Sequence, residues 1–165
     1  MVTTKKLVAT TALVAAVVLG PASPGTADSR CYRHGPGEKR MVRKINRARG
    51  RTGVHRVDRD PELSRVAAVH SRAMARDNRL FHTPSELLAW RVTRWSLLGE
   101  NVAYGSTVGG MHRRFMASPV HRANILRSSY RNVGVAISRR HGWRWVTVIF
   151  EARRDPGTRM DMPRC

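Results

Sequence analysis

The strongest constraint on the fold is a pair of strand-like runs near the C-terminus. Residues Val133–Ile137 and Trp143–Phe150 are rich in β-branched and aromatic side chains, which favour extended backbone. Only the short segment Arg139–Gly142 separates the two runs, so it has to form a turn. The pattern therefore predicts an antiparallel hairpin near the end of the chain.

Two amphipathic helices are predicted before the hairpin. The first runs from Glu38 to about Gly50, with basic residues filling its outer faces. The second begins after Asp60, a suitable N-cap residue, and carries His70 on its inward face. The apolar positions of the two helices are Met41, Val42, Ile45 and Ala48, and then Leu63, Val66, Ala67, Ala73 and Met74.

Residues 1–27 have the features of an export signal. Lys5 and Lys6 supply a positive start, Leu7–Leu19 is almost wholly apolar, and Gly25–Ala27 offers small residues for a signal peptidase. A membrane span needs about 20 apolar residues, and this run is shorter. We expect a cleaved signal and a secreted protein, with an uncleaved anchor as the alternative.

The remaining chain, roughly 138 residues, has the size of one domain with a single core. We divide it into an N-terminal extension over 28–37, a folded domain over 38–152 and an irregular tail over 153–165. No second run is apolar enough to span a membrane. A monomer is expected.

The two cysteines, Cys31 and Cys165, lie at opposite ends of the mature chain. An even number of thiols in an exported protein favours a disulfide. The predicted bond ties the N-terminal extension to the C-terminal tail. Free thiols or pairing between molecules are the alternatives.

The formal net charge is +20, or +18 without Lys5 and Lys6, and arginines scattered through every segment supply most of it. Such a charge attracts polyanions, including anionic polymers of a cell envelope. No motif for sequence-specific nucleic-acid recognition accompanies it. Arginine used as a general solvated cation is the alternative explanation.

Two ionisable residues stand in apolar surroundings in the stretch Leu98–Leu126. Glu100 follows a glycine, and His121 follows a Ser-Pro pair. A buried group of this kind needs a partner, because leaving it unpaired costs several kcal/mol. The inward His70 is a third candidate, although a hydrogen-bonded core histidine explains its position equally well.

Motifs from five parts of the chain occur in a recognisable order. They are Ile45-Asn46 with Arg49, His70-Ser71 with Met74-Ala75, Leu80-Phe81-His82, Gly99-Glu100-Asn101-Val102-Ala103, and Ser118-Pro119 with His121-Arg122 and Asn124-Ile125-Leu126. Together with the hairpin, this order resembles the bacterial branch of the CAP superfamily, whose domain is also called the SCP domain. The superfamily groups cysteine-rich secretory proteins, antigen 5 allergens and plant pathogenesis-related proteins. The resemblance implies an α+β fold, a three-layer α-β-α sandwich with a short, mostly antiparallel sheet.

In many members of that superfamily two histidines and two glutamates line a cavity, sometimes with a divalent metal. His70, Glu100 and His121 match three of these positions. The second glutamate is missing, since no acidic residue lies between Glu100 and Glu151, and Phe115 falls in the segment that would supply it. Two imidazoles and one carboxylate would leave one position open on a metal such as zinc. Without a metal they would form a hydrogen-bonded cluster.

Three classes of function remain open. The first is a secreted binding module that takes up a lipid or a peptide in the cavity. The second is a metal-assisted hydrolase, for instance a protease, and the third is a basic protein that binds the cell envelope. The sequence contains no His-Glu-x-x-His zinc motif and no nucleophile elbow around Ser71, so no catalytic residue is assigned.

Overall fold

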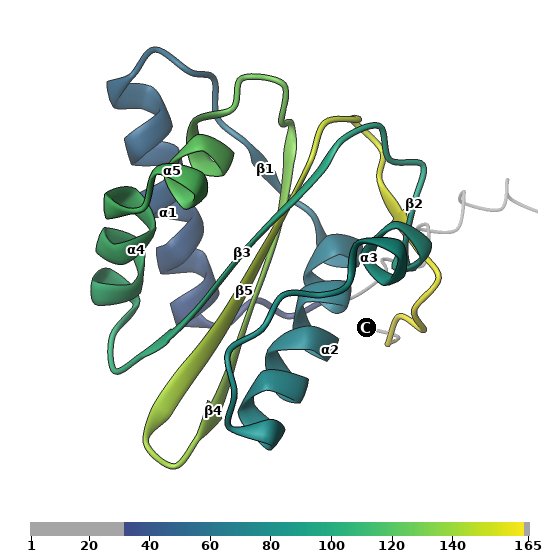
Figure 1. Ribbon diagram of the computed structural model, residues 1–165. Helices are drawn as coiled ribbons and strands as arrows, with labels where there is room; N and C mark the ends of the chain where they lie inside the picture. Colours follow the sequence, from purple (N-terminus) through teal and green to yellow (C-terminus); the bar gives the residue numbers. More distant parts are fainter. Residues whose placement is uncertain (1–31, 164–165) are drawn as a thin grey trace, which may run out of the picture.

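The computed structural model describes residues 32–163 as a mixed fold of helices and strands (Figure 1). The elements are, in chain order, α1 Pro36–Arg51, β1 Asp58–Arg59, α2 Pro61–Asp77, α3 Ser85–Arg91, β2 Val92–Thr93, β3 Leu98–Gly105, α4 Val108–Ala117, α5 Pro119–Leu126, β4 Asn132–Arg140, β5 Trp143–Glu151 and β6 Gly157–Thr158. The predicted export signal and both cysteines lie outside the described residues.

A four-stranded sheet in the order β1-β4-β5-β3 forms the centre of the molecule. The predicted hairpin is present as β4 and β5, and its strands extend until Arg140 pairs with Trp143. The two turn residues, His141 and Gly142, both adopt positive φ, at 48° and 76°. Positive φ at both positions is typical of the two-residue turn whose twist matches that of the strands. Among the strand pairs of residues 32–163, only the short pairing of β1 with β4 is parallel.

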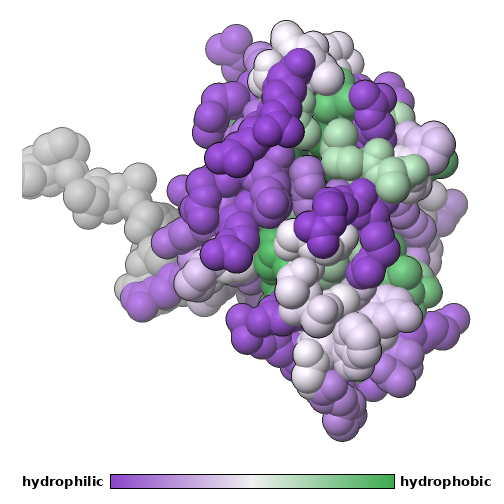
Figure 2. Space-filling model, turned by 90° about the vertical axis from the view of Figure 1, so that its left-hand side faces the viewer, coloured by the Kyte–Doolittle hydropathy of each residue, from purple (hydrophilic) through white to green (hydrophobic). Residues whose placement is uncertain are grey.

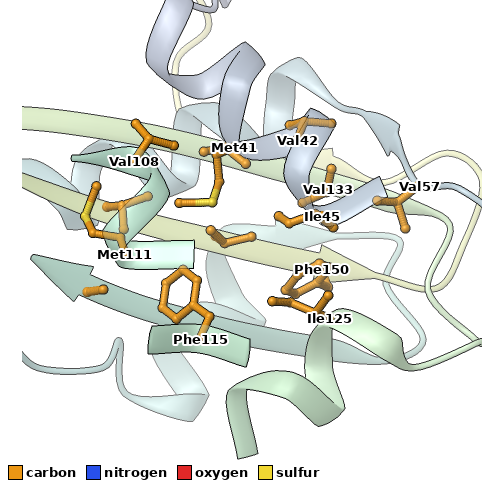
Figure 3. Close-up of a cluster of buried hydrophobic side chains, with 14 of the residues drawn as sticks. Met41, Val42, Ile45, Val57, Val108, Met111, Phe115, Ile125, Val133 and Phe150 are labelled. Carbon is orange, nitrogen blue, oxygen red and sulfur yellow. The ribbon is translucent and has the colours of Figure 1, made fainter. Parts of the chain in front are cut away.

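Helices cover both faces of this sheet (Figure 1). The helix α2 packs on β4 and β5 on one face, while α1, α4 and α5 lie on the other. Side chains from α1, α4, α5 and the sheet meet in the largest core cluster (Figure 3). The predicted α-β-α sandwich is therefore confirmed.

A small second sheet joins two distant segments, since β2 pairs with β6 in antiparallel register. The strand β6 lies in the segment that the sequence predicts as an irregular tail. The helix α3 and the strand β2 fall in an interval without a clear sequence pattern. Within the described part of the chain, no helix has both the length and the apolar character that crossing a membrane requires.

Candidate functional site

The carboxylate of Glu100 is held by three hydrogen bonds. Its side chain is only 5% exposed and projects from the edge strand β3. The Nδ1 atom of His82 lies 2.9 Å from Oε1, which also accepts a bond of 2.9 Å from the Thr83 backbone N–H. The Thr83 hydroxyl donates to Oε2 over 2.7 Å. The segment between α2 and α3 therefore closes over this carboxylate.

These contacts shift the pKa values of both partners. Burial alone would raise the pKa of Glu100, but the bonds from His82 and Thr83 and the nearby charge of His70 together lower it. The pKa of His82 is raised, first by its hydrogen bond to Glu100 and then by the negative charge, against an opposing effect of desolvation. Glu100 and His82 therefore favour the ion pair.

His121 lies on the other side of His82, with 6.3 Å between the ring centroids. Its ring also meets Phe115 edge to face, with a centroid distance of 5.3 Å. Burial, followed by repulsion from His82, lowers the pKa of His121. The neutral form of the imidazole is therefore favoured for His121, and the charged form for His82.

Two asparagines fix the position of His121 relative to β3. The side chain of Asn101 is fully buried and donates to the His121 carbonyl over 2.9 Å. Asn124 donates to Oδ1 of Asn101 over 2.9 Å and to the Glu100 carbonyl over 3.3 Å. These bonds join α5 to β3 and place the residues of the Gly-Glu-Asn and Ser-Pro-x-His motifs side by side.

His70 is placed as a hydrogen-bonded core histidine, which is the alternative that its inward position on α2 left open. It is 3% exposed, and its Nε2 donates to the carbonyl of Phe81 over 2.8 Å. Its ring packs edge to face on Phe81 at 5.0 Å. It influences Glu100 through charge, whereas His82 is the direct partner of Glu100.

His82 and Thr83 belong to the site although the sequence does not predict them as members of it. His82 follows α2 and is not on a helical stripe, so periodicity gives no information about it. The available signal was the Leu80-Phe81-His82 segment, which forms part of the resemblance. Nothing in the sequence around His82, which precedes Thr-Pro, indicates that it pairs with a residue 18 positions away.

An open pocket of about 530 Å³ lies beside this pair, between the end of β3 and the helices α4 and α5. Its floor is buried and apolar, whereas its rim is half exposed and partly aromatic. The lining residues are Leu80, Val102, Ala103, Tyr104, Arg114, Phe115, Ser118, His121 and Trp143. Among the three predicted cavity residues, His121 is the one that lines it.

The model of the cysteine-rich secretory protein family, CAP, matches residues 42–150, which is most of the described chain. The chain belongs to the CAP family. The resemblance seen in the sequence is confirmed. A comparison with curated proteins finds no match.

Solved structures show the same CAP fold at low sequence identity. An outer surface protein from Borrelia burgdorferi has a TM-score of 0.64 at 16% identity, over 72% of this chain and 93% of its own. An extracellular SCP-domain protein from Bacillus anthracis scores 0.62 at 21% identity, over 74% of this chain and 45% of its own. Venom allergen-like protein 4 from Schistosoma mansoni scores 0.63 at 7% identity, over 79% and 97%.

The donor atoms of this CAP domain do not form the metal centre that the resemblance allows as one possibility. Among residues 32–163, no group of three or more His, Cys, Asp or Glu side chains is arranged to hold a metal ion. Both Glu100 oxygens accept hydrogen bonds, and Nε2 of His70 is bound to a carbonyl. These donor atoms are therefore already bound to other groups of the protein.

The coupling between Glu100 and His82 predicts a titration that NMR can follow. Replacing Glu100 by glutamine removes the negative charge, so the pKa of His82 should fall in the Glu100→Gln variant. The imidazole carbon-bound proton of His82 reports this pKa as a function of pH. Glu86→Gln is the matched control, because Glu86 is an exposed acid on the neighbouring helix α3. An unchanged His82 titration in Glu100→Gln would contradict the pairing.

The same pair predicts a pH window for stability. The raised pKa of His82 contributes stability that is full below its ordinary value of 6.5 and is lost as pH rises through the folded-state value. The lowered pKa of Glu100 contributes stability above its ordinary 4.5 that is lost as pH falls through the folded-state value. The stability difference between the wild type and Glu100→Gln should therefore peak between pH 4.5 and 6.5.

Proposed function

We propose that this CAP domain is a secreted binding module that takes up a small apolar molecule with an acidic head group. The observation that carries the proposal is the open, largely apolar pocket beside the His82–Glu100 pair. Its volume of about 530 Å³ is within the usual range of small-molecule sites, roughly 300–1,000 Å³. Secretion is supported by the export signal that the sequence predicts.

The walls of the pocket favour an apolar ligand body. Val102 and Phe115 are 4% and 1% exposed and form the floor, while Leu80 and Trp143 remain exposed at the rim. Large apolar side chains that are exposed beside a pocket mark a surface for ligand binding. A ligand that covers them removes apolar area from water, which is favourable. An acyl chain or a similar hydrocarbon fits this lining.

The polar groups of the pocket favour an acidic head. Arg114 lines it, and its guanidinium donates to the Tyr104 carbonyl at the strand edge. A guanidinium has five N–H donors in a planar fork, so further donors stay available for a carboxylate or phosphate. His121 and Ser118 add polar groups on the same side, and no acidic side chain lines the pocket.

A hydrolase has less support from the geometry. Glu100 is the one carboxylate of the candidate site, and its oxygens are occupied by His82 and Thr83. Its lowered pKa makes it a poor proton acceptor. We interpret the pair as a support that fixes the loop beside the pocket.

Calorimetric titration with dodecanoate tests the proposal. Dodecanoate should bind with one-to-one stoichiometry, and Arg114→Gln should weaken it about tenfold through loss of the charged contact. Arg113→Gln is the matched control, because Arg113 directly precedes Arg114 in α4 and does not line this pocket. A neutral analogue, dodecanol, should bind the wild type and Arg114→Gln alike.

Two results would count against the proposal. One is absence of dodecanoate binding to the folded wild type. The other is an equal loss of affinity in Arg113→Gln and Arg114→Gln, which would mean that the general positive charge attracts the anion. If an unacylated peptide binds the wild type and dodecanoate does not, a peptide ligand is favoured instead.

A further inference from the structure

The outer side of α1 is a row of cations without acidic partners. Successive basic residues face solvent along the whole helix, and within residues 32–163 none of them forms an ion pair. They are Lys39, Arg40, Arg43, Lys44, Arg47 and Arg51. Figure 2, which views the side of the molecule with α1 and α4, shows strongly hydrophilic residues over much of this face.

The row borders a groove of about 510 Å³ between α1 and α4. The exposed Arg47 and Arg51 of α1 face the exposed Arg113 of α4 across it, with Lys44 at its side. His112 also lines the groove, and its Nε2 is buried without a hydrogen-bond partner. Four cations around one hollow repel one another, and an anion bound between them would offset that repulsion.

The other lining residues restrict what the anion can be. No aromatic ring except the imidazole of His112 lines the groove, so it offers no stacking platform for the bases of single-stranded nucleic acid. No carboxylate or amide lines it either, so the hydroxyl groups of a sugar chain would find few side-chain acceptors. Ala48, Met116 and Thr52 complete the lining.

A lipid bilayer also fits this face poorly. Proteins that lie on a bilayer insert exposed aromatic or aliphatic side chains beside their basic residues. The exposed large apolar residues of the described chain are elsewhere, at Leu80, Trp90, Trp95, Tyr104, Val120 and Trp143, and none of them lines the groove. The flat surface of a bilayer would contact the protruding basic residues of α1 without filling the groove between α1 and α4.

We propose that the α1–α4 groove binds a linear phosphodiester polymer without bases, such as a polyol phosphate. Its repeating anions match the arginines, which bind phosphate in a bidentate manner. Arg40, Arg43, Arg47 and Arg51 follow one another on α1 at intervals of three or four residues, or about 4.5–6 Å along the helix axis. The polymer would lie along α1 with its phosphates between Arg47, Arg51 and Arg113. This site is separate from the pocket beside β3.

The test is the affinity of the whole protein for poly(glycerol phosphate) as a function of salt. The triple variant Arg47→Gln, Arg51→Gln, Arg113→Gln should bind at least tenfold more weakly at 150 mM salt. Its slope of log affinity against log salt should fall by about 2 units, because each lost phosphate contact on a single-stranded polyanion removes about 0.7. Glutamine keeps most of the aliphatic stem of arginine, so packing changes little.

The matched control removes three exposed arginines elsewhere, with Arg72→Gln, Arg140→Gln and Arg154→Gln. Both triple variants lower the net charge by three. The control should change the affinity by less than threefold, and both should retain dodecanoate binding. The single variant Arg113→Gln, expected to weaken polymer binding about threefold, serves if the triple variant does not fold.

Equal losses in the two triple variants would overturn the proposal, because they would mean that the total charge and not the groove is responsible. Tighter binding of a single-stranded oligonucleotide, of heparin or of anionic vesicles at equal charge concentration would overturn the assignment of the ligand. If the wild type binds the polymer but not dodecanoate, the proposed function alone would be contradicted.

Discussion

Replacing Arg49 by alanine should lower the free energy of unfolding by about 4 kcal/mol. The side chain is fully buried and donates to four backbone carbonyls. These are His55 at 2.7 Å, Ile125 at 2.8 Å, Arg127 at 2.9 Å and Tyr130 at 3.2 Å. A buried acceptor without its donor costs roughly 1–3 kcal/mol, and we expect the lower end of this range for each carbonyl because the surrounding loops can relax toward water. Urea unfolding followed by circular dichroism measures the change.

The same helix provides the control for this variant. Arg51→Ala removes an exposed arginine two residues away and should change the stability by less than about 0.5 kcal/mol. Arg49→Lys keeps the charge but has one ammonium in place of a five-donor fork. Its loss of stability should therefore lie between those of Arg49→Ala and Arg51→Ala. A loss below about 1 kcal/mol in Arg49→Ala would show that the four carbonyls are not dependent on this side chain.

Gly134→Ala should cost about 3 kcal/mol, although it adds one methyl group. Gly134 lies in β4 directly under the first turn of α2. A Cβ there would be 2.2 Å from the carbonyl carbon of Leu63 and 2.5 Å from the backbone nitrogen of Ser64. Backbone atoms cannot rotate away as a side chain does, so the helix has to move and lose packing. The hydrogen bond from the Val135 N–H to Ser64 Oγ would weaken with it.

Gly50→Ala is the matched control and should have the opposite sign. Gly50 is exposed on α1, and a Cβ there meets nothing within 4 Å. Alanine in a helix is more favourable than glycine by up to about 1 kcal/mol, so the variant should be slightly more stable than the wild type. Thermal unfolding of both variants checks the pair. A Gly134→Ala protein as stable as Gly50→Ala would contradict the close approach of α2 to the sheet.

The sequence predicts the elements whose patterns are local. The hairpin depends on two β-rich runs and one turn, and α1 and α2 depend on apolar stripes, so all of them could be recognised without long-range information. The helix α3 could not, since only Leu88 of its seven residues is buried and no stripe marks it. The pairing of β2 with β6 is also invisible in the sequence, because two residues on each side carry no periodicity.

The candidate site could be predicted only where a local pattern marks its residues. Glu100 and His121 stand out as ionisable residues in apolar stretches, and the fold brings their segments together through Asn101 and Asn124. The inward position of His70 is compatible with a cluster, but its nearest acceptor is the Phe81 carbonyl. The partner of Glu100 comes from a loop, where neither periodicity nor burial marks a residue beforehand.

The most direct test of the proposed function is an NMR titration of ¹⁵N-labelled protein with dodecanoate. The largest backbone amide shifts should occur around the pocket beside β3, at Leu80, Val102, Arg114 and His121. The α1–α4 groove should respond to poly(glycerol phosphate) instead. Dodecanoate shifts concentrated at Lys44, Arg47 and Arg113, with an unchanged spectrum around β3, would contradict the proposal that this pocket receives the ligand.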